Sequence, residues 1–191
     1  MFRECVTSPD KAQQVASTLK TIEKGMAQYL AVARRMGAKN VQNFAYILGA
    51  IHWKEASCDF RGVLHNGEKI VGTNLKTKLV PKGRGPFATW EDAAVDAIGI
   101  ESKKWKVLLG GSDDVGDILY ALERYNGTGY ISGAGKRDVS PYLWENSNIS
   151  DGTGKYVSDG KYDADRKLGA TAGAAVILKE AYRQGAFDVR V

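Results

Sequence analysis

The sequence predicts an α+β fold that is mostly α: a helical domain with a small β-hairpin wing. Apolar residues recur at spacings of three and four along most of the chain, which is typical of amphipathic helices. One Asn-Gly pair lies between short extended segments and predicts a single hairpin. With 191 residues and no repeat, we expect one domain over residues 1–191, with a helical segment at 1–37 packed against it.

The composition excludes several classes of protein. Hydrophobic residues make up 43% of the chain and charged residues 26%, which excludes whole-chain disorder. The longest apolar stretch, residues 41–53, is shorter than the ~18 residues of a membrane span, so we expect no stable membrane insertion. The first ten residues lack the apolar run of a secretory signal. We therefore expect synthesis in a host cytoplasm without a signal peptide.

The chain carries 27 Lys and Arg against 22 Asp and Glu, a formal charge of +5. This excess favours encounters with anionic surfaces such as nucleic acid, membranes or a bacterial wall. No helix-turn-helix pattern and no basic helical face accompany it. We expect no nucleic-acid partner.

Two helices are predicted in the first 56 residues. Ser8 and Pro9 suit the start of the first, Gly25 can divide it, and Gly37 suits its end. Asn40 is a fitting N-cap for the second, whose apolar stripe includes Leu48 and Ile51. Glu55 continues this stripe. A carboxyl at an inward position must be paired, protonated or used, because burying it bare is costly.

The middle of the chain predicts the β-element. Residues 63–71 form a hairpin around Asn66-Gly67, and residues 75–80 can add a third strand before a Gly- and Pro-rich loop. Helices are expected to begin at Thr89, with Asp92 completing a capping box, and at 112–114. The second of these stops at 125–127. A long loop with large aromatic residues follows over 126–162, and a last helix runs from about Asp165 to Gln184.

Six blocks of the sequence carry a resemblance to a known family. They are HWKEASCDF (52–60), LHNG (64–67), VPKGR (80–84), ERYNGTGY (123–130), SPYLW (140–144) and GKYVSDG (154–160). Their order and spacing resemble the lysozyme-like peptidoglycan hydrolases of the phage endolysin type, near goose-type lysozymes and soluble lytic transglycosylases. The resemblance covers about residues 41–178. Asn148 is followed by Ile149 and Ser150, where the family tends to have an aromatic residue.

The resemblance implies a lysozyme-like catalytic domain and assigns Glu55 as the general acid. In the family this Glu ends a core helix beside the hairpin and protonates the glycosidic oxygen between MurNAc and GlcNAc. An apolar environment keeps such a carboxyl protonated near neutral pH. The expected activity is that of a glycosidase, a muramidase. In the alternative, a lytic transglycosylase, the same Glu acts as acid and then base, and 1,6-anhydro products form.

Two residues are candidates for a second catalytic carboxylate, and the sequence does not choose between them. Asp59 lies four residues after Glu55 and can act as this carboxylate, or it can cap the turn after the helix. Glu123 faces inward four residues after Leu119, and it can equally bind loop backbone. Retaining and inverting glycosidases differ in the separation of the two carboxylates, which the sequence does not give.

Further residues are candidates for substrate binding. Aromatic rings stack on sugar faces but also pack in cores, and Asn126 can hold a sugar amide or end a helix. The candidate substrate-binding residues are His52, Tyr125, Asn126, Tyr130, Tyr142 and Trp144.

The sequence gives less support to cysteine, calcium or zinc chemistry. A cysteine hydrolase would use Cys58 with His52 or His65, but the end of a helix raises a thiol pKa. Whether Cys5 and Cys58 pair is open. The Asp residues at 151–165 do not have calcium-loop spacing, and the two histidines do not form a zinc motif. We expect no metal and no cofactor.

The sequence thus predicts an antimicrobial, cell-wall-lysing hydrolase whose partner is bacterial peptidoglycan, acting as a monomer. It would reach the wall as a bacteriophage endolysin after release from the cytoplasm, or be carried in a virion. The alternative outside enzymes is a non-catalytic cell-wall-binding or virion structural module. Such a module would keep the aromatic residues without needing an inward Glu55.

Overall fold

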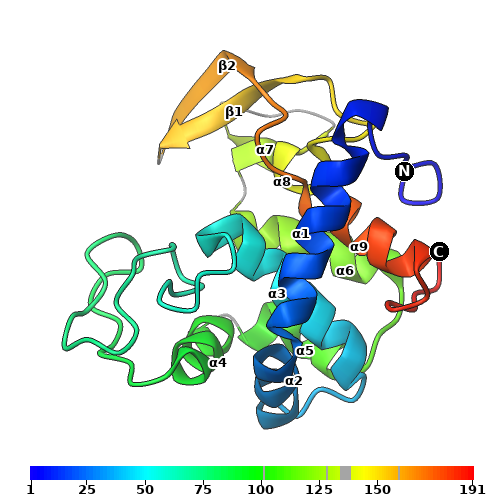
Figure 1. Cartoon of the computed structure of the whole chain (residues 1–191). Coiled ribbons are helices and arrows are strands. Elements are labelled where there is room, and N and C mark those ends of the chain that lie inside the picture. Colours follow the sequence, from blue (N-terminus) through cyan, green and yellow to red (C-terminus); the bar gives the residue numbers. More distant parts are fainter. Residues whose placement is uncertain (101, 128, 134–138, 159) are drawn as a thin grey trace. The chain divides into compact units, whose positions relative to one another are not determined.

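The computed structural model describes residues 1–100, 102–127, 129–133, 139–158 and 160–191. This part is mostly helical with one two-stranded antiparallel sheet, which confirms the predicted α+β class (Figure 1). The chain divides into two compact units. Unit 1 comprises residues 1–20 and 114–191, and unit 2 comprises residues 21–113. Among the described residues, no helix combines the length and apolar character that crossing a bilayer requires.

The boundary between the units falls within α1 (Ala12–Lys24). Gly25 then separates α1 from α2 (Met26–Arg35), as the sequence predicts. A Cβ at Gly25 would lie 2.6 Å from the Phe60 ring, so only glycine fits there. Gly37 ends this helical segment with a φ of +73°. That one domain spans residues 1–191 stays a prediction.

Unit 2 is built around α3 (Val41–Ala56). The Asn40 side chain caps it, accepting from the Asn43 N–H at 3.1 Å as expected. All residues from Asn43 to His52 are buried, so the helix is buried around its whole circumference rather than along one stripe. This explains its nearly unbroken apolar sequence. Helices α2, α4 (Trp90–Ile100) and α5 (Ser102–Leu109) complete the unit.

The predicted hairpin at 63–71 and the third strand at 75–80 were wrong. Residues 57–89 are all described and contain only an isolated bridge between Gly62 and Lys69. Backbone bonds still cross the Asn-Gly turn, from the Val63 N–H to the Glu68 carbonyl at 3.0 Å and from the Val71 N–H to the Arg61 carbonyl at 3.1 Å, but they do not form a ladder. In residues 75–80, side chains occupy backbone groups that a ladder would use. The Glu68 carboxylate accepts from the N–H groups of Lys78 and Leu79, both at 3.0 Å, and the Thr77 hydroxyl accepts from the Arg84 N–H. A small apolar cluster holds the segment together: Val63, Ile70, Val71, Phe87 and Ala93.

Unit 1 holds the first part of α1 and six further elements. These are α6 (Val115–Asn126), α7 (Gly129–Ser132), α8 (Pro141–Trp144), β1 (Thr153–Ser158), β2 (Lys161–Lys167) and α9 (Ala174–Arg183). A short 3-10 turn, Pro9–Lys11, precedes α1; Ser8 stands at its N-cap position, but its side chain makes no capping bond. Asp114 caps α6 through the Gly116 N–H at 2.8 Å, at the predicted start.

The sheet lies where the sequence predicted a loop. Strands β1 and β2 pair with Tyr156 opposite Tyr162. The predicted loop 126–162, of which residues 128, 134–138 and 159 lie outside the described part, contains β1 and the start of β2; β2 continues to Lys167, into the predicted last helix. The last helix begins at Ala174, nine residues later than expected. The reason is Glu145, whose buried carboxylate accepts from the N–H groups of Gly169 at 2.8 Å and Thr171 at 3.2 Å. These bonds hold 169–171 outside a helix.

Candidate functional site

Glu55 lies in the last turn of α3, one residue before the helix ends, and is half-buried. The helix stops because Ser57 and Cys58 both adopt left-handed backbone angles, with φ values of 52° and 60°. The Ser57 N–H returns to the Trp53 carbonyl at 3.0 Å. Glu55 therefore lies where α3, buried from Asn43 to His52, meets the irregular segment 57–89. At this position the residue is partly exposed.

The Asn66-Gly67 turn abuts the backbone of Glu55. Gly67 has a φ of +78°, and a Cβ built on it would lie 2.2 Å from the Glu55 carbonyl oxygen. A Cβ at Gly62 would lie 2.6 Å from the Ala56 Cβ. Two glycines thus allow residues 62–67 to lie against the end of α3. The predicted turn exists, although the strands that were to flank it do not.

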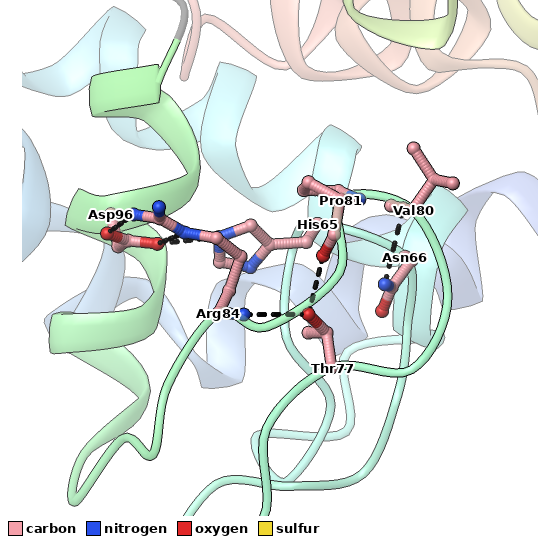
Figure 2. Close-up of polar contacts among 7 residues, drawn as sticks. All are labelled: His65, Asn66, Thr77, Val80, Pro81, Arg84 and Asp96. Atoms are coloured by element: carbon pink, nitrogen blue, oxygen red, sulfur yellow. Dashed lines mark hydrogen bonds and ion pairs between the residues drawn. The ribbon is translucent and has the colours of Figure 1, made fainter.

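An ion-pair cluster anchors this turn to α4. The His65 Nε2 lies 2.9 Å from the Asp96 Oδ2, and Arg84 binds both carboxylate oxygens of Asp96 through its Nε and Nη2 (Figure 2). His65 also stacks on Phe87, with ring centroids 5.6 Å apart. Because His65 directly precedes Asn66, the cluster fixes the turn that lies against Glu55.

The protonation states in the cluster follow from its geometry. Burial lowers the pKa of His65, with a smaller opposing effect from Asp96. Partial burial raises the pKa of Asp96, but the hydrogen bonds from Arg84 and His65 outweigh it, and the pKa is lowered overall. An ionised carboxylate only accepts, so His65 is neutral with its proton on Nε2. Its buried Nδ1 has no hydrogen-bond partner.

The same loop is held at its far end by backbone and side-chain contacts. Thr77 donates its hydroxyl proton to the Pro81 carbonyl and accepts from the Arg84 N–H, and Asn66 donates to the Val80 carbonyl at 3.3 Å (Figure 2). The Thr77 N–H donates to the Arg84 carbonyl at 2.9 Å. Residues 77–84 therefore form a closed loop whose conformation is set by its own polar groups.

Asp59, one candidate for the second carboxylate, is engaged by two cations. Arg61 donates from its Nη2 to the Asp59 Oδ2 at 2.8 Å, and the Lys69 Nζ lies 3.0 Å from the same oxygen. The Asp59 Oδ1 accepts from the Arg61 backbone and Nε. The hydrogen bonds from Arg61, then that from Lys69, hold its pKa well below the usual range. This arrangement favours the turn-capping alternative over a nucleophile or base.

His52 is fully buried in unit 2, which corrects its predicted role in substrate binding. Its Nε2 lies 3.1 Å from the Asp59 carbonyl oxygen, which can only accept, and its Nδ1 lies 2.9 Å from the Tyr29 hydroxyl. The imidazole is therefore neutral with Nε2 protonated. Burial lowers its pKa to about 4. With no exposed surface, His52 stabilises the segment after α3 instead of contacting a glycan.

Glu123 is the most unusual carboxyl of unit 1. It lies on α6 with 8% of its surface exposed, and neither carboxylate oxygen has a hydrogen-bond partner in the described part of the chain. Burial raises its pKa; the nearby Ser140 hydroxyl has a smaller opposite effect, but its Oγ does not reach hydrogen-bonding geometry. A general acid needs a carboxyl that keeps its proton at a pH above the ordinary pKa of a carboxyl. Its predicted alternative, a bond to loop backbone, is not formed among the described residues.

Three of the four candidate aromatic residues are buried in unit 1. Tyr130 holds β1, accepting from the Tyr156 N–H at 3.1 Å and meeting the Tyr156 ring edge-on. Tyr142 and Trp144 lie buried on α8. Buried rings have no free face for a sugar, so these three predictions are corrected to structural roles. Tyr125 is half-buried and Asn126 is exposed, at the end of α6.

Cysteine and metal chemistries find little support. Both cysteines are free thiols. Burial raises the pKa of Cys58 to about 11, so its thiolate is scarce at neutral pH. Within the described residues, no group of His, Cys, Asp and Glu side chains is placed to hold a metal ion.

No family model matches the chain, and neither the search of curated proteins nor that of solved structures gave a match. The site therefore has to be judged on its geometry. The sequence pointed to Glu55 but missed Asp96 and Glu145. Asp96 lies between Val95 and Ala97 in an apolar stretch, and this signal could have singled it out; Glu145 is followed by polar residues and carries no such signal.

Proposed function

We propose that the protein cleaves the glycan strand of bacterial peptidoglycan, with Glu55 as the general acid. The observation that supports this proposal is the placement of Glu55. It is a half-buried carboxyl at the end of a buried helix, beside a glycine turn that is anchored to α4. The rigid setting suits a group that must meet a glycosidic oxygen in one orientation. The family resemblance supplies the substrate class.

The chemistry assigned to Glu55 is proton donation to the leaving oxygen. In a muramidase, the bond from the sugar carbon to this oxygen breaks, water attacks the carbon, and the ionised Glu or a second carboxylate accepts the proton of the water. In a lytic transglycosylase, the 6-hydroxyl of the same sugar attacks, and the ionised Glu accepts its proton. The engagement of Asp59 by Arg61 and Lys69 favours this second candidate, since the carboxylate nearest in sequence is occupied as an ion-pair partner.

The test is digestion of purified peptidoglycan by the wild type and by Glu55→Gln, followed by mass spectrometry of the soluble products. General acid catalysis contributes ~10²–10⁴ in rate, so the variant should release almost no muropeptides. The matched control is Glu91→Gln, which changes another half-buried glutamate of unit 2 on α4. It should digest as the wild type does.

The termini of the products separate the two reactions. Reducing sugars identify hydrolysis, and 1,6-anhydro sugars identify lytic transglycosylation. Equal digestion by wild type and Glu55→Gln would remove Glu55 from the mechanism. Wall binding without any digestion by the wild type would favour the non-catalytic wall-binding or virion module and contradict the proposed activity.

A further inference from the structure

The loop at residues 72–87 exposes an unusual set of aliphatic side chains. Leu75 is 53% exposed, Leu79 57% and Val80 68%. Three large aliphatic residues within six positions are not scattered singly, as exposed apolar residues usually are. Figure 2 shows Val80 on the outer bend of the loop, with its side chain directed away from the contacts that hold the loop closed. We name Leu75, Leu79 and Val80 the aliphatic tip.

Basic residues surround the aliphatic tip. Residues 72–87 contain Lys76, Lys78, Lys82 and Arg84 and no Asp or Glu. Arg84 is neutralised by Asp96. The three lysines are exposed and form no ion pair with any residue that the structure describes. The Glu68 carboxylate, which binds the N–H groups of Lys78 and Leu79, offsets part of the charge of Lys78. The segment still presents hydrocarbon and a net positive charge together.

The loop is also preorganised. The Glu68 carboxylate binds the N–H groups of Lys78 and Leu79, directly before Val80. Thr77 ties the two sides of the bend together through Pro81 and Arg84. Fixing the backbone before binding removes part of the ordering cost of association. These bonds also explain why aliphatic side chains stay exposed, since the backbone has no freedom to fold them inward.

We propose that the loop 72–87 is a docking surface for an anionic lipid bilayer. Lysines near a negatively charged membrane surface attract it, and aliphatic side chains enter the boundary between headgroups and acyl chains. The charge of the loop is complementary to an anionic headgroup layer. This surface contact is distinct from the insertion of a helix into the bilayer.

The exposed aliphatic side chains favour a bilayer over an anionic wall polymer as the partner of the loop. A sugar-phosphate or glycan chain can pair with the three lysines, but it offers no apolar phase for Leu75, Leu79 and Val80. Water would then remain around more than half of each side chain's surface. Of these two, the lipid surface satisfies both features of the loop, because burying aliphatic area is favourable and roughly proportional to the area removed from water.

The experiment is sedimentation of the full chain with vesicles of phosphatidylcholine containing a third of phosphatidylglycerol, against vesicles of phosphatidylcholine alone. The wild type should bind the anionic vesicles more tightly, and salt should weaken this binding. K76Q/K78Q/K82Q should weaken it about a hundredfold, at about fivefold for each lysine. L79S/V80S should weaken it roughly tenfold or more.

Matched controls lie elsewhere on the chain. K20Q/K24Q/K106Q removes three exposed lysines outside the loop, and V107S removes an aliphatic side chain that is 53% exposed on α5. Both should bind as the wild type does. Failure to bind anionic vesicles, or equal losses in the control variants, would overturn the proposal. A third result would also overturn it: weak vesicle binding together with lysine-dependent binding to soluble teichoic acid, if L79S/V80S leaves the latter unchanged. None of these binding measurements depends on glycan cleavage, so their result is independent of the proposed activity.

Discussion

Gly67 lies so close to Glu55 that no side chain fits between them. A Cβ at Gly67 would approach the Glu55 carbonyl oxygen to 2.2 Å, and the backbone of Gly67 is in the left-handed region with a φ of +78°. The position of the turn and the position of the proposed catalytic residue therefore depend on each other. Any residue other than glycine must push either the turn or the end of α3 away.

Gly67→Ala should destabilise the protein through both strain and collision. Left-handed backbone angles cost a non-glycine residue about 1–3 kcal/mol, and the collision with Glu55 adds to this. Gly72→Ala is the matched control, because Gly72 has a φ of +74° but nothing within 4 Å of its Cβ position. Urea denaturation should show a larger loss for Gly67→Ala than for Gly72→Ala. Equal losses would contradict the close approach.

Asp96→Asn should release the loop 72–87 from α4. The substitution removes the carboxylate that Arg84 and His65 bind, and hydrogen bonds to charged groups contribute about 1.5–3 kcal/mol. Limited trypsin digestion should then cut faster at Lys76, Lys78 and Lys82. Asp92→Asn, one turn earlier on α4, is the control and should leave those sites as slow as in the wild type. Unchanged cleavage in Asp96→Asn would mean that other contacts hold the loop.

Glu123 should make the protein less stable as pH rises. Its folded pKa is above the ordinary 4.5 because of burial, so between these values the folded state binds more protons than the unfolded state. Stability falls as pH increases through this window and stays at the lower level above the folded pKa. Glu123→Gln should remove this decline and unfold at a higher temperature than the wild type at pH 7.

The exposed Glu4 provides the control for that comparison. Thermal unfolding of Glu4→Gln between pH 4 and 8 should follow the wild type. A wild-type profile that Glu123→Gln leaves unchanged would show that the carboxyl is solvated when the protein is folded. If Glu123→Gln is more stable yet loses peptidoglycan digestion, the residue has a catalytic role.

His52 should titrate far below its ordinary range. Burial lowers its pKa from 6.5 to about 4, so the unfolded state binds more protons between these values. The contribution to stability is complete above pH 6.5 and is lost as pH falls towards 4, by roughly 3 kcal/mol. The chain has 2 histidines, and nitrogen NMR of the imidazoles, assigned with His65→Gln, should show the Nε2-protonated form of His52 at pH 7. A pKa near 6.5 would contradict its burial.

Helix boundaries could be predicted where a local group sets them. Asn40 and Asp114 cap their helices through bonds to residues two or three positions away, and Gly25 separates two helices as expected. The Asn-Gly turn is also a local signal and is present, but the side chain that keeps residues 75–80 out of a third strand acts over a longer distance. Glu68 reaches Lys78 and Leu79.

The true sheet and most of the site depend on long-range contacts. Strands β1 and β2 are mostly polar and largely exposed, so they lack the alternation that marks a half-buried strand. Asp96 meets a histidine 31 positions away, and Glu145 meets Thr171, 26 positions away. Glu55 could be located from its helix alone. The burial of His52, Tyr142 and Trp144 could not, since periodicity does not tell a core aromatic from one that lines a cleft.

The division of the chain has a consequence for the order of folding. Unit 2 is one unbroken stretch, residues 21–113, whereas unit 1 joins residues 1–20 to residues 114–191. During synthesis, all of unit 2 is made before α6, so its contacts can form on the nascent chain while the rest of unit 1 is still being added. Unit 1 must wait for α9, and its non-local closure is then the slow step. The beginning of α1 is therefore made before unit 2 but finds its partners in unit 1 only after unit 2 is complete.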